Sequence, residues 1–272
     1  MTAQPEHLET EPLVRDPRDA VGAAEARRRP LLGPAYYASG RPSLWRDLRA
    51  LLHPPYTAWH LSYVVIGGLL ARSVSWSTLG ATVLAFFLAV GIGAHALDEL
   101  HGRPLSTAVP SSWLAAAAAI SLSGAAAIGL LGVERVGAGL AGFVAVGVVL
   151  VLAYNLELAN GRLHSDLVFA LAWGAFPVLV SAFAQARSLS WSAVVVAAGA
   201  GLLSAAQRTL STPARRLRRQ APGVTGAIEY RDGRREEISA SSLVAPLESA
   251  LRLLSLGVVA LAAGLTLARA LH

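Results

Sequence analysis

Hydrophobic residues form seven long runs, separated by short polar segments. The runs lie near residues 56–72, 76–98, 111–132, 136–155, 166–185, 190–208 and 245–270. Each holds about 18–25 residues, enough for an α-helix to cross a hydrocarbon core of about 30 Å. The pattern predicts an all-α, polytopic transmembrane bundle of about seven helices.

The segment before the first run has a different pattern. Residues 1–42 mix acidic, basic and proline residues without hydrophobic periodicity, which predicts a disordered tail ahead of a membrane domain at 43–272. Residues 43–53 place Leu44, Leu48, Leu51 and Leu52 on one helical face. We therefore expect a short amphipathic helix in the membrane interface, ended by Pro54-Pro55.

The longest internal polar segment, 209–244, is expected to be a loop with two parts. Its basic stretch, Ser211 to Gln220, suits anionic lipid head groups. Residues 224–231 and 234–239 are candidate strands on either side of Asp232-Gly233, a pair that favours a type I′ turn. We expect a small β-hairpin there, which is either a cap over the cytoplasmic face or a passive insertion.

Composition supports the membrane class. Only 15% of the residues are charged, against about 25% in soluble domains, and the mean hydropathy is +0.51. There is no cysteine, so disulfides and thiolate metal sites are excluded. The net charge of +6 does not indicate a nucleic-acid partner, because the basic residues flank the apolar runs.

Arginine placement predicts the orientation. Every basic residue is Arg, which is typical of a GC-rich bacterial genome. One set of loops holds Arg46, Arg49, Arg103, Arg162, Arg208, Arg215, Arg216, Arg218 and Arg219, whereas the opposite set holds only Arg72, Arg135 and Arg187. The positive-inside rule places the first set, and the N-terminus, in the cytoplasm of a bacterial inner (plasma) membrane.

The end of the second run carries the first group of candidate catalytic or metal-binding residues. His95, Asp98 and Glu99 share a helical face at i, i+3 and i+4, and His101 follows closely. Imidazole and carboxylate groups can hold a divalent cation. The alternative is a helix end that reaches water, where charged side chains need no function.

Two further polar groups fall on the same side. The segment after the fourth run offers Glu157 and His164 as metal ligands, and Tyr154, Asn155 and Arg162 as substrate-binding residues. Asp166 is more simply a first-turn acid of the fifth helix. Arg208 follows Gln207 at the end of the sixth run and is either a phosphate ligand or a topological anchor. His60 is expected to be a satisfied core histidine.

Together these segments resemble the UbiA superfamily of membrane prenyltransferases. Ala94 to Leu105 stands where the family has its first Asp-rich motif, with Asp98 at the middle Asp and Arg103-Pro104-Leu105 similar to the family's RPL. Tyr154 to Arg162 resembles its YPxxKR segment, and Phe169 to Pro177 its F-x-WG-x-P pattern. At the second Asp-rich motif the chain has Gln207 to Ser211, without a carboxylate. The resemblance covers about residues 44–212.

The resemblance implies a UbiA-like fold and an enzyme that transfers a prenyl group at the cytoplasmic face. It implies Mg²⁺, and the histidines also suit Fe, Mn or Zn. His95, Asp98 and Glu99 would be catalytic, and Arg103, Arg162 and Arg208 would bind an isoprenoid diphosphate or another lipid substrate. The alternatives are a non-catalytic lipid- or partner-binding membrane protein and a small-solute transporter.

Overall fold

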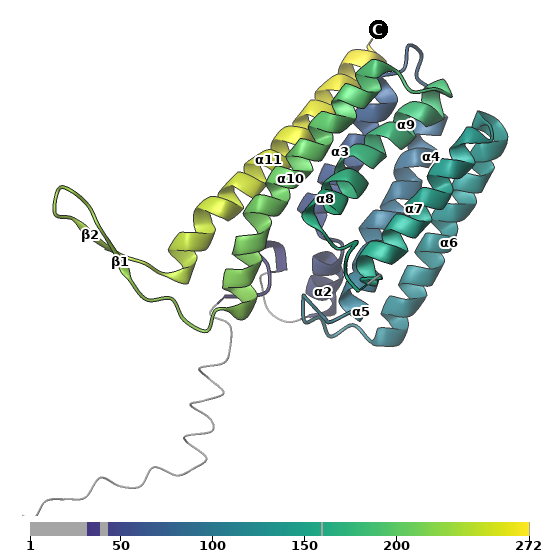
Figure 1. The fold of residues 1–272 in the computed structure, drawn as a ribbon. Helices are drawn as coiled ribbons and strands as arrows, with labels where there is room; N and C mark the ends of the chain where they lie inside the picture. The colour runs from purple at the N-terminus through teal and green to yellow at the C-terminus, as the bar shows by residue number, and fades with distance from the viewer. Residues whose placement is uncertain (1–31, 39–42, 159, 272) are drawn as a thin grey trace, which may run out of the picture.

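The computed structural model describes residues 32–38, 43–158 and 160–271. Within these residues the chain is a bundle of long helices with one small hairpin (Figure 1). Five helices are long and apolar enough to cross a membrane: Trp76–Leu100, Ser111–Val136, Asp166–Ala186, Trp191–Gln220 and Ala240–Ala270. A shorter apolar helix, Gly139–Asn155, lies among them. The multi-pass helical prediction is thereby confirmed for the described part of the chain.

Seven helical segments follow the seven predicted runs. They are α3 (Pro54–Leu69), α4–η2–α5 (Trp76–Phe86, Phe87–Ala94 and His95–Leu100), α6 (Ser111–Val136), α7 (Gly139–Asn155), α8–η3–α9 (Asp166–Phe169, Ala170–Ala175 and Phe176–Ala186), α10 (Trp191–Gln220) and α11 (Ala240–Ala270). The segments η2 and η3 are π-helical turns inside otherwise continuous helices. Such wider turns are frequent at functional sites.

Close helix packing depends on small residues. A Cβ atom on Gly67 would stand 2.3 Å from the Val178 carbonyl oxygen, and one on Gly174 would stand 2.6 Å from that of Ala200. Glycine therefore lets α3 approach α9, and η3 approach α10, until their backbones touch. This packing fixes the wall against which the polar cavity described below is built.

The extent of α10 corrects one prediction. The helix continues through Pro213 to Gln220, so the stretch 211–220 is helical and the connecting loop is 221–239 rather than 209–244. Arg218 and Arg219 at its end contact other segments: Arg218 pairs with Glu248 of α11, and Arg219 donates to the Pro34 carbonyl. These tertiary contacts favour the helix despite the proline.

At the N-terminal side, α2 (Leu44–Leu51) is the predicted amphipathic helix, capped by the Ser43 side chain. Pro54 and Pro55 open α3 rather than ending α2, because proline fits the first turn of a helix, where its missing N–H is not needed. Residues 32–38 include the 3₁₀ helix η1 (Tyr36–Ala38) packed against the bundle, unlike the disordered tail predicted for 1–42. The rest of that predicted tail lies outside the described residues.

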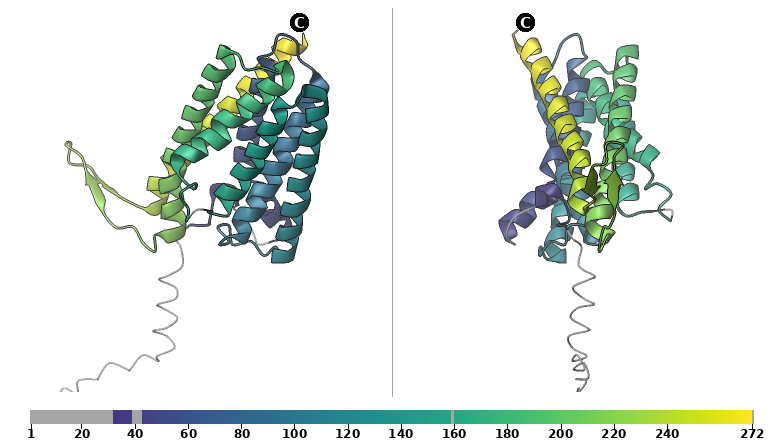
Figure 2. Two further views of the ribbon diagram at one scale, coloured as in Figure 1. Left: turned by 45° about the vertical axis from the view of Figure 1, so that its right-hand side comes forward. Right: turned by 90° about the vertical axis from the view of Figure 1, so that its left-hand side faces the viewer.

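The predicted hairpin is present. Strand β1 (Ala227–Glu229) pairs antiparallel with β2 (Arg235–Glu237), and Gly233 adopts φ +81° in the turn. The hairpin projects away from the bundle in Figures 1 and 2.

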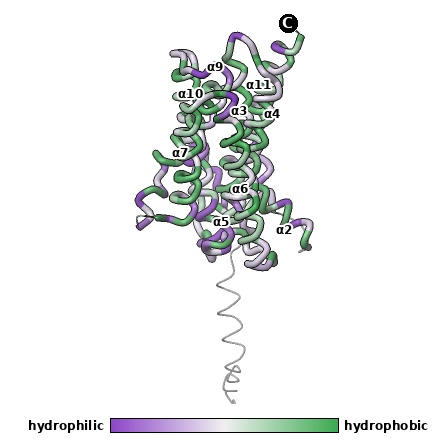
Figure 3. Tube along the Cα trace, turned by 90° about the vertical axis from the view of Figure 1, so that its right-hand side faces the viewer, coloured by the Kyte–Doolittle hydropathy of each residue, from purple (hydrophilic) through white to green (hydrophobic). Residues whose placement is uncertain are grey.

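The loops after α5, α7 and α10 gather at one end of the bundle, together with α2, and the C-terminal end of α11 lies at the other end (Figures 1 and 2). Hydrophobic residues dominate the middle of the bundle, and hydrophilic residues gather toward its ends (Figure 3). The three polar groups identified in the sequence therefore lie at the same end.

Candidate functional site

A cavity of about 510 Å³ lies at this end of the bundle. We call it the polar cavity. It collects residues from all three polar groups of the sequence: His95, Asp98 and His101; Tyr154, Asn155, Glu157 and His164; Gln207 and Arg208. The structure thus brings together segments that are more than a hundred residues apart in the chain.

One wall of the polar cavity is cationic. Arg208, Arg215 and Arg219 all line the cavity. They lie on one face of α10, because Arg215 and Arg219 follow Arg208 by seven and eleven residues. Arg208 donates to Asp166 at 2.8 Å and stacks over the Phe169 ring at 5.2 Å. Neither Arg215 nor Arg219 forms an ion pair with any described residue. Two guanidinium groups are therefore available to an anionic ligand.

Asp98 is the acid that faces this wall. It lines the cavity and interacts electrostatically with His164, Arg215 and Arg219. Its carboxylate makes no hydrogen bond or ion pair with another described residue. Among the described residues, the other two acids that line the cavity are placed elsewhere: Glu248 pairs with Arg218, and Glu157 lies beside His101 and His164.

The segment 32–38 covers part of the polar cavity, and arginines hold it there. Arg218 pairs with Glu248 through two hydrogen bonds, one of 2.8 Å from Nη2 to Oε2, and also donates to the Gly33 carbonyl at 3.0 Å. Arg219 donates to the Pro34 carbonyl at 3.2 Å. The bidentate pair with Glu248 occupies the Arg218 charge, so this residue is structural.

An aromatic cluster joins this segment to the bundle. The Tyr37 hydroxyl lies 3.2 Å from Nδ1 of His53, and the His53 ring stacks on His95 at 4.1 Å. Burial lowers the pKa of His53 well below its usual range, and the neighbouring His95 and Arg219 lower it further. Burial also raises the pKa of Tyr37. Both groups are neutral near pH 7.

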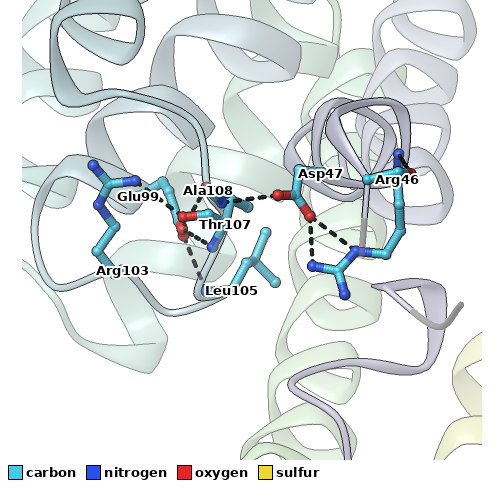
Figure 4. Close-up of polar contacts among 8 residues, drawn as sticks. Arg46, Asp47, Glu99, Arg103, Leu105, Thr107 and Ala108 are labelled. Carbon is cyan, nitrogen blue, oxygen red and sulfur yellow. Dashed lines mark hydrogen bonds and ion pairs between the residues drawn. The ribbon is translucent and has the colours of Figure 1, made fainter. Parts of the chain in front are cut away.

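Glu99, a predicted catalytic and metal-binding residue, does not line the polar cavity. Glu99 is only 1% exposed. Its carboxylate accepts hydrogen bonds from the backbone N–H groups of Leu105 and Thr107 and from the Thr107 hydroxyl, at 2.9–3.0 Å (Figure 4). The loop after α5 folds back onto it. In this arrangement Glu99 shapes the loop and presents no oxygen to the cavity.

Arg103 has a similar structural role. It donates to the carbonyls of Thr107 and Val109 and to the Ser111 hydroxyl, and is not among the cavity-lining residues of the described chain. Arg162 is exposed in the loop after α7 and likewise does not line the cavity. Two of the three arginines predicted to bind substrate are thus placed elsewhere. Asp166 is the first residue of α8, as expected, behind the Ser165 cap.

The acid–histidine pairs at the cavity mouth were the remaining metal candidates. Glu157 has carboxylate oxygens 3.9 Å from His101 Nε2 and 3.9 Å from His164 Nδ1. Within residues 32–38, 43–158 and 160–271, no three His, Asp or Glu side chains form a group able to hold a metal. A divalent metal therefore stays an expectation from the resemblance.

An apolar cavity of about 310 Å³ adjoins the polar one. Its walls come from α4, η2, α6, α7 and α9, and Val90 and Trp173 line both cavities. These two residues mark the boundary between a charged compartment at the end of the bundle and an apolar compartment between the helices.

Sequence reasoning missed Arg215 and Arg219 as site residues, and also His53 and the tyrosines at 36, 37 and 56. The arginines had a detectable signal. With α10 extended past Pro213, Arg208, Ser211, Arg215 and Arg219 follow helical spacing on one face. The tyrosines had none: Tyr36 and Tyr37 reach the cavity through the packing of residues 32–38, and Tyr56 lies in the first turn of α3.

A scan against protein-family models, a search of curated proteins and a search of solved structures each found no match to this chain.

Proposed function

We propose that the protein is a UbiA-like membrane protein that binds, and acts on, an isoprenoid or other lipid with a phosphate-containing head group. The observation that carries this proposal is the contact between two compartments of opposite character. The polar cavity has an arginine wall, and the apolar cavity meets it at Val90 and Trp173. An amphiphile with an anionic head and an apolar chain suits both compartments at once.

The head group would lie between Arg215 and Arg219. A planar guanidinium presents paired N–H donors that match phosphate oxygens, and neither residue has an acidic partner within the described chain. Preorganised cations that face developing negative charge stabilise a departing diphosphate. In a transfer reaction these arginines would supply that stabilisation.

Divalent metal remains an expectation from the resemblance alone. Glu99 is engaged with its loop, and the second Asp-rich position is occupied by Gln207 and Arg208. The proposal therefore assigns head-group binding to arginine and derives no step through a metal.

A second candidate function is a non-catalytic lipid-binding membrane protein on the same scaffold. The observation that favours it is the lack of a carboxylate at the second Asp-rich position. Asp98, Glu157 and Glu248 are the acids among the described residues that line the cavity. Binding without turnover of the bound prenyl diphosphate would support this candidate.

The orientation proposed here places the polar cavity at the cytoplasmic face of a bacterial inner membrane. The basic residues of α10 and of the loops after α5 and α7 support it, because they lie at the cavity end. Cysteine-scanning with a membrane-impermeant thiol reagent tests it, with the 137–138 turn as the opposite-face control. Labelling of the 221–239 loop from outside intact cells would contradict it.

The binding experiment uses the full chain in lipid nanodiscs. Farnesyl diphosphate is titrated against farnesol, which lacks the head, and pyrophosphate, which lacks the chain, each with and without Mg²⁺. We expect farnesyl diphosphate to bind at least about tenfold more tightly than either part, because both compartments contribute. Equal affinity for farnesol and farnesyl diphosphate would contradict a head-group role for the arginine wall.

A variant at the boundary tests the link between compartments. Val90→Phe is expected to reduce the gain in affinity from geranyl to farnesyl diphosphate, since it narrows the passage into the apolar cavity. Ile120→Phe on the exposed face of α6 is the matched control. An unchanged chain-length dependence in a folded Val90→Phe protein would exclude the apolar cavity as the chain site.

A further inference from the structure

Residues 32–38 form a short segment, which we call the strap, that covers part of the polar cavity. Its residues 34–37 line the cavity wall. On the opposite side, Ser211 of α10 lines the same cavity and is only 5% exposed. The strap thus forms part of the barrier between water and the inside of the cavity.

Side chains of other elements, and not a continuous helix or sheet, hold the strap in place. From α10, two arginines donate to the carbonyls of Gly33 and Pro34. From α11, the Arg252 guanidinium lies 4.7 Å from the centre of the Tyr36 ring. The aromatic cluster around Tyr37 adds contacts just before α3. The strap is therefore attached at separate points, each a contact with one side chain.

The buried apolar part of the strap is small. Ala35 and Ala38 pack with Ala50 of α2 and with Leu105, and the partly buried Tyr37 lies against them. An alanine side chain is a single methyl group, so its burial contributes little hydrophobic stabilisation. Parts of a protein with few buried apolar groups open at low free-energy cost while the rest stays folded. The strap can therefore open without unfolding the bundle.

Arg219 connects the strap to the arginine wall. Its Nε donates to the Pro34 carbonyl at 3.2 Å, and its Nη1 and Nη2 have no acceptor among the described residues. A guanidinium is planar and its N–H groups have fixed directions, so the Pro34 contact orients the two remaining nitrogens. A phosphate bound by those nitrogens would hold the guanidinium in the same orientation. Each contact would then stabilise the other.

We propose that the strap is a gate of the polar cavity. It opens to admit an anionic head group, and it closes over that group when Arg219 binds both Pro34 and a phosphate oxygen. Opening moves the Pro34 carbonyl away from Arg219 and exposes the cavity wall that carries Ser211. The coupling to a head group rests on the proposed function, whereas the opening of the strap does not, so the two are tested separately.

The first experiment measures opening without a ligand, on the full chain in nanodiscs. The chain has no cysteine, so Ser211→Cys places a single thiol in the cavity, and its reaction with a water-soluble sulfonated methanethiosulfonate is timed. Adding Ala38→Gln should speed this reaction at least about tenfold, because a long polar side chain does not fit the 4% exposed position of Ala38 and favours the open strap.

Two controls isolate the strap. Ala138→Gln, an exposed position at the other end of the bundle, should change the Ser211→Cys rate by less than about twofold. Ser241→Cys, exposed on the first turn of α11, should react equally fast with and without Ala38→Gln. If Ala38→Gln and Ala138→Gln gave the same Ser211→Cys rate, the gate would be overturned.

The second experiment locks the strap. Ala35→Cys and Ala50→Cys, two positions of one cluster, are joined by a short bifunctional thiol reagent with a reducible linker. The lock should slow the association of pyrophosphate at least about tenfold, and reductant should restore it, because only the open strap admits the ligand. The matched pair is Ser75→Cys with Gln185→Cys, positions hydrogen-bonded to each other at the other end of the bundle, and it should leave the association rate unchanged.

The outcomes separate the two proposals. Pyrophosphate that enters the locked protein as fast as the reduced one would overturn the gate. Pyrophosphate that binds no form of the protein would overturn the head-group site, and the Ser211→Cys rates would then decide the gate alone.

Discussion

Two polar regions lie side by side at one end of the bundle, and they differ in how completely their groups are paired. In the first, which we call the loop network, Glu99 and Asp47 each accept hydrogen bonds at both carboxylate oxygens (Figure 4). In the second, the polar cavity, Arg215 and Arg219 have no acidic partner among the described residues. The loop network is complete without a ligand, and the cavity is not.

The comparison separates structural from functional polar residues. Asp98 and Glu99 are neighbours in the sequence, yet Asp98 faces the arginine wall and Glu99 holds the 105–107 loop. A polar cluster at a helix end therefore carries no single role. Structural and functional polar residues differ in how many of their hydrogen-bonding atoms are still without a partner in the protein, not in residue type.

The largest expected effect breaks the loop network. Glu99→Ala leaves the buried N–H groups of Leu105 and Thr107 without acceptors, and each unsatisfied buried donor costs about 1–3 kcal/mol. We expect a loss of about 3–5 kcal/mol in the free energy of unfolding, summed over these donors. Thermal unfolding in detergent measures it, and Asp98→Ala, without such hydrogen bonds, is the control. An equal loss in both variants would remove the distinction between the regions.

The next effect concerns the polar cavity. Arg215→Gln should weaken farnesyl diphosphate binding by about 10–100-fold, because a charge-assisted hydrogen bond contributes about 1.5–3 kcal/mol. The melting temperature without ligand should change little, since the guanidinium makes only a 3.4 Å contact to Thr212.

Arg216→Gln is the matched control for that variant. Arg216 is exposed, on the same turn of α10, and does not line the cavity. Arg216→Gln should change the affinity for farnesyl diphosphate by less than about twofold, which corresponds to less than about half a kcal/mol. If Arg216→Gln weakened binding as strongly, general surface charge rather than the arginine wall would attract the ligand.

The sequence predicted the helices because their periodic apolar runs are local features. It predicted the hairpin from Asp232-Gly233 for the same reason. Most of the candidate site residues line the polar cavity: His95, Asp98, His101, Tyr154, Asn155, Glu157, His164 and Arg208. Local spacing places side chains on one face of a helix. Because successive membrane helices run in opposite directions, the second, fourth and sixth helices end on the same side of the bundle.

What could not be predicted depends on non-local packing. The role of Glu99 is set by a loop that folds back onto it from residues 105–107. The sixth apolar run ends near residue 208, so the sequence predicts a loop at Arg215 and Arg219. Pro213 also disfavours a helix interior. The contacts of Arg218 with Glu248, and of Arg219 with Pro34, reach across the fold and outweigh that preference.

The polar cavity also predicts a dependence of stability on pH. Burial lowers the pKa of His53, with His95, Arg219, Arg215 and His60 adding to the shift. Its unfolded pKa is about 6.5. As the pH falls below that value the unfolded chain binds a proton that the folded chain does not, so the folded state loses stability by up to about 1.4 kcal/mol per pH unit. Melting temperatures between pH 5 and 7.5 should show this loss in the wild type and a smaller loss in His53→Gln. A His101→Gln control at the exposed mouth should keep the wild-type profile.

The smallest expected effect returns to the loop network. Burial raises the pKa of Asp47, but the Ala108 N–H and the Arg46 guanidinium lower it by more, so the pKa lies below its usual value. A carboxyl with a depressed folded pKa stabilises the protein above the unfolded pKa, about 3.9, and this contribution is lost as the pH falls through the folded pKa. Asp47→Asn should therefore lower the melting temperature at pH 7 by an amount equivalent to about 1–2 kcal/mol, the range of one hydrogen bond to a charged group. As the pH falls from the unfolded pKa through the depressed folded pKa, the difference from the wild type should shrink, because the carboxyl becomes neutral like the amide. A difference that stays constant from pH 7 to pH 3 would mean that Asp47 acts through packing alone, and the loop network would then rest on Glu99.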